Sequence, residues 1–265
     1  FYNKNLPEID YAAIEQKADQ ATRSASGSML ALFSEKIENM VVSSADLSNS
    51  DKTEGFLKNS KPFKKGDFSG GFLHAGVSEL TMACIMNGMA LHGGIIPVCG
   101  TFFVFSDYMK PAFRMSALMR QQVIYVWTHD AFRVGEDGPT HQPVEHELQV
   151  RLMEALKNHK GKNSMLVLRP ADVDETTVAW KMALENQDTP TALILSRQNV
   201  KNLPRKESKY NEALGATKGA YIVKDCEGTA DVILLASGSE VSTLVAVTEL
   251  LESRANLNVR IVSVT

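Results

Sequence analysis

The feature of the sequence that most constrains the fold is an alternation of short apolar runs with segments of helical periodicity. Strands buried on both faces of a parallel sheet are nearly continuous apolar runs, whereas strands of a half-exposed antiparallel sheet alternate apolar and polar residues. The runs in this chain are of the continuous kind. We therefore predict the α/β class, with a parallel sheet that carries helices on both faces and right-handed crossovers between its strands.

The predicted elements alternate along the chain. The expected strands are residues 40–43, 72–74, 95–99, 123–128, 165–168 and 192–195. The expected helices, whose apolar residues recur at three- and four-residue steps, are residues 11–38, 78–91, 107–120, 144–158 and 173–186. Residues 46–69 and 130–143 are rich in polar residues and helix breakers, so we expect them to be loops.

A second, incomplete α/β unit is predicted after a polar linker at residues 201–210. Its expected strands and helix are residues 221–224, 232–236, 259–264 and, for the helix, 241–251. We place one domain at residues 1–205, of which residues 1–10 resemble a linker, and the start of a second domain at residues 206–265. Because the chain starts without Met and stops directly after a strand, we expect it to be a piece of a longer protein.

Composition argues against several classes of function. A net charge of −3 without a dense basic cluster argues against a nucleic-acid partner. No apolar run approaches the roughly 20 residues that cross a bilayer, so no membrane span is predicted. The three cysteines, Cys84, Cys99 and Cys226, are far apart and form no CxxC motif, which argues against a disulfide framework and a zinc site. We predict reduced thiols and a cytoplasmic protein.

An acid at the start of an apolar helix is the first candidate for chemistry. Glu79 follows Ser78 and precedes a segment that is almost entirely apolar. In a structural interpretation, Ser78 caps the helix and the helix dipole stabilises a carboxylate in the first turn. In a functional interpretation, burial raises the pKa of Glu79, and the protonated acid donates a hydrogen bond to a ring nitrogen. The residues alone leave both interpretations open.

The loop after the fourth predicted strand is the second candidate. It begins at His129 and holds several acids, and loops positioned by a rigid scaffold often carry function. Metal binding is disfavoured because His141, Glu145 and His146 lack the HExxH spacing. Pro143 also disfavours a helix at this point. We predict no metal ligands in this chain.

Arginines and aromatic residues form the remaining candidates. Arg23, Ser50 and Arg197 lie near predicted loop or helix ends, and guanidinium groups and hydroxyls suit phosphate oxygens. An aromatic stretch follows the third predicted strand and comprises Phe102, Phe103, Phe105 and Tyr108. Such a stretch is ordinarily core packing, but it can also form the wall of a slot for a flat heteroaromatic ring.

Several long motifs occur in a fixed order. The longest is residues 135–145, which read GEDGPTHQPVE. The others are SADL at 44–47, the segment 74–87 around Glu79, LHGG at 91–94, RPAD at 169–172 and PTALILSRQN at 190–199. In these motifs the sequence resembles the transketolases over essentially its whole length. The resemblance is to their central pyrimidine-binding domain and the start of their C-terminal domain.

The resemblance implies thiamine-diphosphate-dependent transfer of a two-carbon ketol unit from a ketose phosphate to an aldose phosphate in the pentose phosphate pathway. It assigns to Glu79 a catalytic hydrogen bond to the ring nitrogen of the cofactor's aminopyrimidine, and to Phe105 the stacking on that ring. The further cofactor neighbours that it implies are Asp46, Phe102, Tyr108 and His141, of which His141 also has a catalytic role.

On the substrate side, the resemblance implies that His129 and Asp137 contact the sugar near its reacting carbons. It implies that Arg23, Ser50 and Arg197 hold the terminal phosphate. The metal, Mg²⁺ or Ca²⁺, is expected in an N-terminal diphosphate-binding domain, whose GDG motif does not occur in this chain. Since the family forms homodimers with the cofactor between subunits, this chain is expected to hold half a site and to be inactive by itself.

Other relatives remain as alternatives. 1-Deoxyxylulose-5-phosphate synthase resembles the THQ region but not the full GEDGPTHQPVE motif or the SRQN run. Dihydroxyacetone synthase is not excluded by this segment, and a test with formaldehyde as acceptor separates it. A hypothesis of a different class is a non-catalytic, pyrimidine-side subunit of a split transketolase, which we expect to contain a complete third domain.

Overall fold

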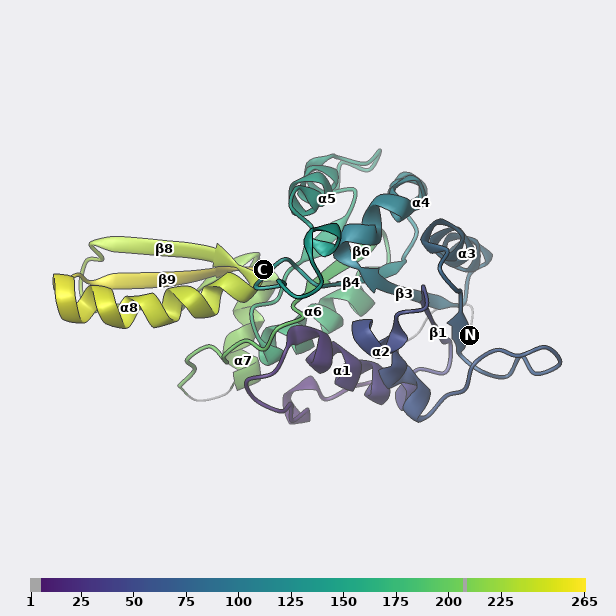
Figure 1. Cartoon of the computed structure of the whole chain (residues 1–265), viewed down its shortest axis with the longest axis horizontal. Helices are drawn as coiled ribbons and strands as arrows, with labels where there is room; N and C mark the ends of the chain where they lie inside the picture. Colours follow the sequence, from purple (N-terminus) through teal and green to yellow (C-terminus); the bar gives the residue numbers. More distant parts are fainter. Residues whose placement is uncertain (1–5, 207–208) are drawn as a thin grey trace.

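The larger part of the molecule is an α/β unit built on one six-stranded parallel sheet (Figure 1). The computed structural model describes residues 6–206 and 209–265. In spatial order the strands are β2 (Phe72–His74), β1 (Met40–Ser44), β3 (Ile96–Phe102), β4 (Ile124–Thr128), β6 (Thr191–Leu195) and β5 (Leu166–Leu168). The predicted fold class, a parallel sheet of apolar strands, is confirmed.

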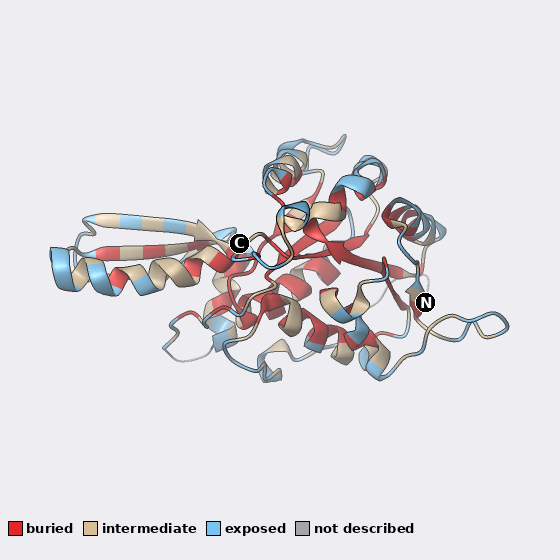
Figure 2. Ribbon diagram, in the orientation of Figure 1, coloured by how far each residue is buried: buried red, intermediate tan, exposed pale blue. Residues whose placement is uncertain are grey.

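Helices cover both faces of this sheet, as predicted. One face packs against α1 (Thr22–Lys36) and α6 (Val173–Glu185), and the other against α3 (Glu79–His92), α4 (Ser106–Met119) and α5 (His146–Ala155). The side chains of β4 divide between the two cores. Ile124 and Val126 pack on the α1/α6 side, whereas Tyr125 and Trp127 pack on the α3/α4/α5 side. All five β4 residues are buried, because a strand covered on both faces has no solvent side (Figure 2).

The helix predicted at residues 11–38 is wrong in its first half. Helix α1 begins only at Thr22, after a 3₁₀ turn at Tyr11–Ala13. The chain between them is held by a distant loop instead, because the backbone N–H of Asp19 donates to Asn202 Oδ1 at 2.9 Å and Lys201 pairs with the Asp19 carboxylate. Asp19 also has a positive φ of 54°, which interrupts a helix.

Two other expectations need correction. The predicted loop 46–69 contains the short helix α2 (Ser48–Asp51) and a 3₁₀ helix at Thr53–Lys58. The helix predicted at 144–158 is shorter, since α5 spans His146–Ala155 and the residues after it fold into a turn closed by the Lys157–Asn163 bridge.

The smaller unit is a three-stranded sheet, β7 (Ala220–Lys224), β9 (Val259–Val264) and β8 (Val232–Ser237) in spatial order. Strand β8 pairs with β9 in parallel, and β7 pairs with β9 antiparallel. Helix α8 (Val241–Ala255) packs on one face of the sheet (Figure 1). Large apolar side chains remain exposed in this unit, namely Ile222, Ile233 and Leu235 on the sheet and Leu250 on α8. The predicted linker 201–210 includes the start of α7 (Lys209–Ala213), and its residues 207–208 lie outside the described residues.

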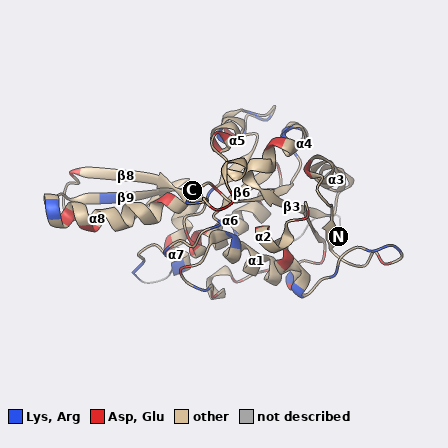
Figure 3. Ribbon diagram, in the orientation of Figure 1, with Lys and Arg blue, Asp and Glu red and all other residues tan. Residues whose placement is uncertain are grey.

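An ion-pair network centred on the buried Arg169 joins the two units. Its guanidinium contacts Asp130 of the large unit at 3.1 Å and Glu240 of the small unit at 2.7 Å. It also donates to the Ser237 carbonyl oxygen at 3.3 Å, and Ser239 Oγ donates to the Asp130 carboxylate. Charged residues of both signs are spread over the two units (Figure 3). Within residues 6–206 and 209–265, no helix combines the length and apolar character needed to cross a bilayer.

Candidate functional site

The candidate site lies at the carboxyl ends of the strands, where the strand order reverses. Strand β1 pairs with β2 on one side and with β3 on the other. The chain therefore passes from β1 to β2 on one side of β1, and then crosses to β3 on its other side. In open α/β sheets, ligands bind in the crevice outside such a switch point. All but one of the site residues predicted from the sequence lie at or after the carboxyl ends of these strands or of β4 and β6; the exception is Arg23, at the start of α1.

Aromatic side chains form a continuous wall at this edge. The Phe102 ring lies 3.7 Å from the His129 ring and 5.9 Å from the rings of Phe105 and His141, measured between centroids. Phe105 in turn contacts His141 at 5.3 Å and Tyr108 at 6.2 Å. Tyr108 is 62% exposed, so this end of the wall is open to solvent. The predicted cofactor residues of the aromatic stretch and the two histidines are thus brought together.

Glu79 is the first residue of α3 and is buried, with 9% of its surface exposed. Among the residues that the structure describes, it has neither a hydrogen-bond partner nor an ion-pair partner. The predicted cap by Ser78 is wrong, because Ser78 Oγ donates to the Ala75 carbonyl oxygen at 2.7 Å and does not accept from the helix. Because the carboxyl group of this buried residue has no partner in the described structure, it is available to bind a ligand.

The polar residues of the site form two groups, one around the Asp137 carboxylate and one around the Arg23 guanidinium. His129 Nε2 lies 3.7 Å from Asp137 Oδ2, and Arg197 Nε lies 3.3 Å from the same oxygen. Arg23 Nη1 donates to the Ser50 carbonyl oxygen at 2.7 Å. The Ser50 contact therefore uses the backbone and not the hydroxyl group that the sequence suggested.

His129 is held in its neutral form. Its burial, together with the nearby Arg23, Arg197 and His141, lowers its pKa from 6.5 to about 3. The contact with Asp137 is therefore not an ion pair at neutral pH. A neutral imidazole can accept a hydrogen bond from a sugar hydroxyl or donate one to a carbonyl oxygen.

Beside these groups lies a pocket of about 550 Å³ that is lined by Arg23, Arg133, Arg197, Gln198 and Asn199. Burial lowers the pKa of Arg23 and the neighbouring Arg197 adds to this, whereas Asp137, Asp51 and Glu136 oppose it. Arg23 Nε is buried and has no hydrogen-bond partner in the described part of the chain. Arg197 is already paired with Glu136 and Asp137, and an anion in the pocket would give the unmet donor of Arg23 an acceptor.

Two residues of this region were not singled out from the sequence. Arg133 contributes a third guanidinium to the pocket and has a positive φ of 52°, a backbone conformation that the sequence does not reveal. Asp51 is fully buried behind the site, where Ser44 Oγ donates to it at 2.6 Å. Its place in a polar run of the sequence concealed this burial.

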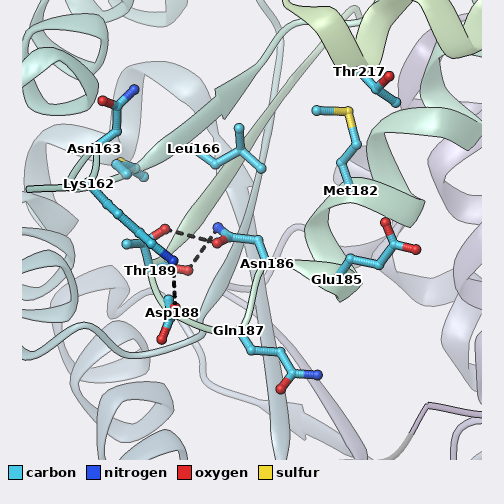
Figure 4. Close-up of a pocket in the computed structure, with 11 residues that line it drawn as sticks. Lys162, Asn163, Leu166, Met182, Glu185, Asn186, Gln187, Asp188, Thr189 and Thr217 are labelled. Atoms are coloured by element: carbon cyan, nitrogen blue, oxygen red, sulfur yellow. Dashed lines mark hydrogen bonds and ion pairs between the residues drawn. The ribbon is translucent and has the colours of Figure 1, made fainter. Parts of the chain in front are cut away.

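Asp46 is not joined to the others. It lies two residues after the end of β1 with a φ of 64°, is exposed, and within the described residues makes no hydrogen bond or ion pair with the aromatic wall or the arginines. A larger pocket, of about 600 Å³, lies at the opposite, amino-terminal edge of the sheet (Figure 4). There Lys162 pairs with Asp188 at 3.3 Å and Asn186 bonds with Thr189, so several of its polar groups pair with one another.

Comparison with known proteins agrees with this geometry. Residues 18–202 match the family model of the transketolase pyrimidine-binding domain, and residues 219–265 match that of the transketolase-like C-terminal domain. The chain belongs to the transketolase family. Its relatives include the transketolase of Halalkalibacterium halodurans, 49% identical over 88% of this chain, and that of Bacillus subtilis, 46% identical over 94%.

Solved transketolase structures resemble the whole chain. That from Leishmania mexicana matches 99% of it with a TM-score of 0.86 at 39% identity. The Pichia stipitis transketolase in complex with sedoheptulose 7-phosphate matches 99% with a TM-score of 0.85 at 34% identity. This chain covers 33% and 35% of the two curated relatives and 37% and 38% of the two solved chains. It therefore spans about a third of the length of the transketolases that it matches.

A chain of a split-gene transketolase, described as an inactive beta4 tetramer, also matches, with a TM-score of 0.70 at 25% identity. This chain covers 71% of that structure, and the match extends over 92% of this chain.

Proposed function

We propose that this chain is the pyrimidine-side part of a thiamine-diphosphate-dependent transketolase that transfers a two-carbon ketol unit between sugar phosphates. The observation that carries the proposal is Glu79, a largely buried carboxyl group without a partner in the described structure, in a chain of this family. We retain the proposed domains at residues 1–205 and 206–265, and a cytoplasmic location.

The site residues suit an aminopyrimidine. Glu79 would hydrogen-bond a ring nitrogen, Phe105 would stack on the ring, and Phe102 and Tyr108 would extend that apolar surface. When bound, thiamine diphosphate would supply the nucleophilic carbon and the electron sink for breaking and forming carbon–carbon bonds. The protein supplies orientation: His141, which contacts the Phe105 ring, would position a hydrogen-bonding group beside it. Asp46 is proposed to contact the cofactor as well, and Mg²⁺ or Ca²⁺ is proposed to be held outside this chain.

The pocket at Arg23, Arg133 and Arg197 would bind the terminal phosphate of the sugar. Ser50 would contribute through the loop that Arg23 holds in place. His129 and Asp137 lie between this pocket and the aromatic wall, so they would contact hydroxyl groups near the reacting carbons. This order of groups along the site fits a substrate with a phosphate at one end and reacting carbons at the other.

A homodimer is the proposed assembly. Helices α3 and α4 pack side by side, and both expose large apolar side chains. These are Leu80, Ile85 and Leu91 on α3 and Tyr108, Met115 and Leu118 on α4, each at least 39% exposed. Exposed apolar groups of this density are typical of an interface. Analytical ultracentrifugation would test it, and a monomer at micromolar concentration would argue against it.

The decisive experiment is ketol transfer from xylulose 5-phosphate to ribose 5-phosphate with thiamine diphosphate and Mg²⁺. We expect no turnover from this chain alone and turnover from the protein made from its complete gene. In that protein, Glu79→Ala should lower kcat by roughly 10²- to 10³-fold, the usual range for the loss of one positioned hydrogen-bond donor. The exposed Glu38→Ala serves as the matched control. An unimpaired Glu79→Ala enzyme would refute the role of Glu79.

The alternatives remain testable in the same assay. Activity with formaldehyde as acceptor in place of ribose 5-phosphate would identify a dihydroxyacetone synthase. Activity with pyruvate as donor would identify a 1-deoxyxylulose-5-phosphate synthase. The match to a split-gene chain keeps the subunit hypothesis open. If the complete gene encodes no diphosphate-binding domain and activity requires a second polypeptide, this chain is a subunit of a split enzyme.

A further inference from the structure

Helices α4 and α5 bring together three side chains that are distant in the sequence. Asp107 lies in the first turn of α4, Glu145 is the residue before α5, and His146 is its first residue. One potential ligand atom from each of these side chains lies within 4.8 Å of the other two. The spacing of Glu145 and His146 alone gives no metal motif, and Asp107 joins them only because the two helices pack against the same sheet face.

The buried imidazole of His146 has one nitrogen engaged and one free. His146 is 4% exposed, and its Nε2 lies 3.0 Å from the Val104 carbonyl oxygen. Because a carbonyl oxygen only accepts, Nε2 carries the hydrogen in this contact and Nδ1 has the lone pair. Nδ1 is buried without a hydrogen-bond partner in the described structure, and Glu145 Oε2 lies 3.7 Å from it.

This arrangement has the features of a metal-binding histidine. Histidine ligands in proteins usually donate their second ring N–H to a backbone carbonyl or a carboxylate, which orients the ring and fixes its tautomer. The Val104 carbonyl oxygen takes that part here, and Asp107 Oδ2 lies 3.1 Å from the same nitrogen. The orientation of the ring, and with it the direction of the Nδ1 lone pair, is therefore set before any ion binds, and Nδ1 is shielded from water.

The two carboxylates must move to share one ion with Nδ1. Ligands bound to one tetrahedral zinc ion at 2.0–2.2 Å are about 3.4 Å apart. Glu145 already lies on the Nδ1 side of the ring, whereas Asp107 contacts Nε2 and must turn toward Nδ1 to share an ion with it; its side chain is 49% exposed and has room to do so. The start of a helix presents roughly half a positive charge, which disfavours a cation there. The two full negative charges of Asp107 and Glu145 outweigh this effect.

We propose that Asp107, Glu145 and His146 form a binding site for a divalent transition-metal ion, with Zn²⁺ as the best fit. One imidazole and two carboxylates favour Zn²⁺ over Mg²⁺, which prefers an all-oxygen, octahedral shell. Water completes the coordination, since the two carboxylates reach solvent. The site is independent of the proposed ketol transfer.

The test is a Zn²⁺ titration of this chain against a chromophoric chelator at neutral pH with millimolar Mg²⁺ present. Cys84→Ser and Cys226→Ser are made in the background, because these two thiols are not buried and would compete for the ion. We expect one Zn²⁺ per chain. His146→Gln, which keeps an amide donor for Val104, and the surface changes Glu145→Gln and Asp107→Asn should each weaken binding by at least about tenfold. The exposed His159→Gln is the control and should leave the affinity unchanged.

A second readout separates binding from misfolding. Excess Zn²⁺ should raise the Tm of the parent chain and of His159→Gln. Glu145→Gln should show no such rise. Its Tm without Zn²⁺, measured in the same experiment, shows whether the variant is folded. X-ray absorption at the zinc edge should show one imidazole among nitrogen and oxygen ligands. Binding that is substoichiometric, or that survives His146→Gln and Glu145→Gln, would overturn the proposal and leave His146 as a buried imidazole between two acids.

Discussion

Asp51 is a buried acid whose replacement by Asn should make the protein more stable at neutral pH. Its side chain is fully buried and accepts three hydrogen bonds, from Ser44 Oγ at 2.6 Å and from the N–H and Oγ1 of Thr53 at 2.8 and 2.6 Å. Burial raises the pKa of this carboxyl group from 3.8 to about 6, against the opposing effect of these hydrogen bonds. The folded state therefore favours the protonated acid.

The sign of the pH dependence follows from this shift. Below about pH 4 the acid is protonated in both states, so it costs nothing. As the pH rises from 3.8 to about 6, the unfolded chain ionises more readily than the folded one, and the fold loses stability. Above pH 6 the loss is complete and amounts to about 3 kcal/mol, since one pKa unit corresponds to about 1.4 kcal/mol.

Asp51→Asn removes the ionisation and keeps the shape. The amide oxygen can accept from both Thr53 donors, and the amide nitrogen can donate to Ser44 Oγ. We therefore expect the stability of the variant relative to the parent to increase by roughly 2 kcal/mol between pH 4.5 and 7.5. The exposed Glu38→Gln is the control, and its stability relative to the parent should not change with pH.

Urea unfolding followed by tryptophan fluorescence is a suitable assay. The chain has two tryptophans, and both Trp127 and Trp180 are buried in the large unit that contains Asp51. A difference in unfolding free energy that stays constant from pH 4.5 to 7.5 would refute the raised pKa. A variant that is less stable than the parent at pH 7.5 would show that the hydrogen bonds favour the carboxylate more than burial disfavours it.

Three further changes probe the site and the junction of the two units. In the complete enzyme, Arg197→Ala should raise KM for phosphorylated substrates by roughly 10- to 100-fold, because it removes a charge-assisted hydrogen bond; an unchanged KM would argue against phosphate binding. Arg169→Met leaves the buried Asp130 carboxylate without its cation and should lower the unfolding free energy by about 3–5 kcal/mol, whereas Arg260→Met on the surface should have little effect. NMR titration should find His129 neutral throughout pH 5–8, and its lowered pKa should cost stability as the pH falls below 6.5; protonation near pH 6.5 would contradict its burial.

The sequence by itself determined the architecture of the sheet and the region of the site. Continuous apolar runs such as 124–128 can be buried only between two layers of helices, so they predicted the parallel sheet directly. The motif GEDGPTHQPVE located the loop that carries His141 and Asp137, and strand order then placed it at the carboxyl edge. These features are local, and a short stretch of residues is enough to specify them.

Only the tertiary structure decided the features that depend on contacts between distant segments. Helix α1 starts late because Asp19 bonds to Asn202, and Asp51 is buried because the surrounding elements close over a polar run. Asp107 meets His146 because α4 and α5 share a sheet face. Hydrogen bonding, desolvation and ligand geometry act over a few ångströms in space, and positions far apart in the chain reach those distances only when it folds.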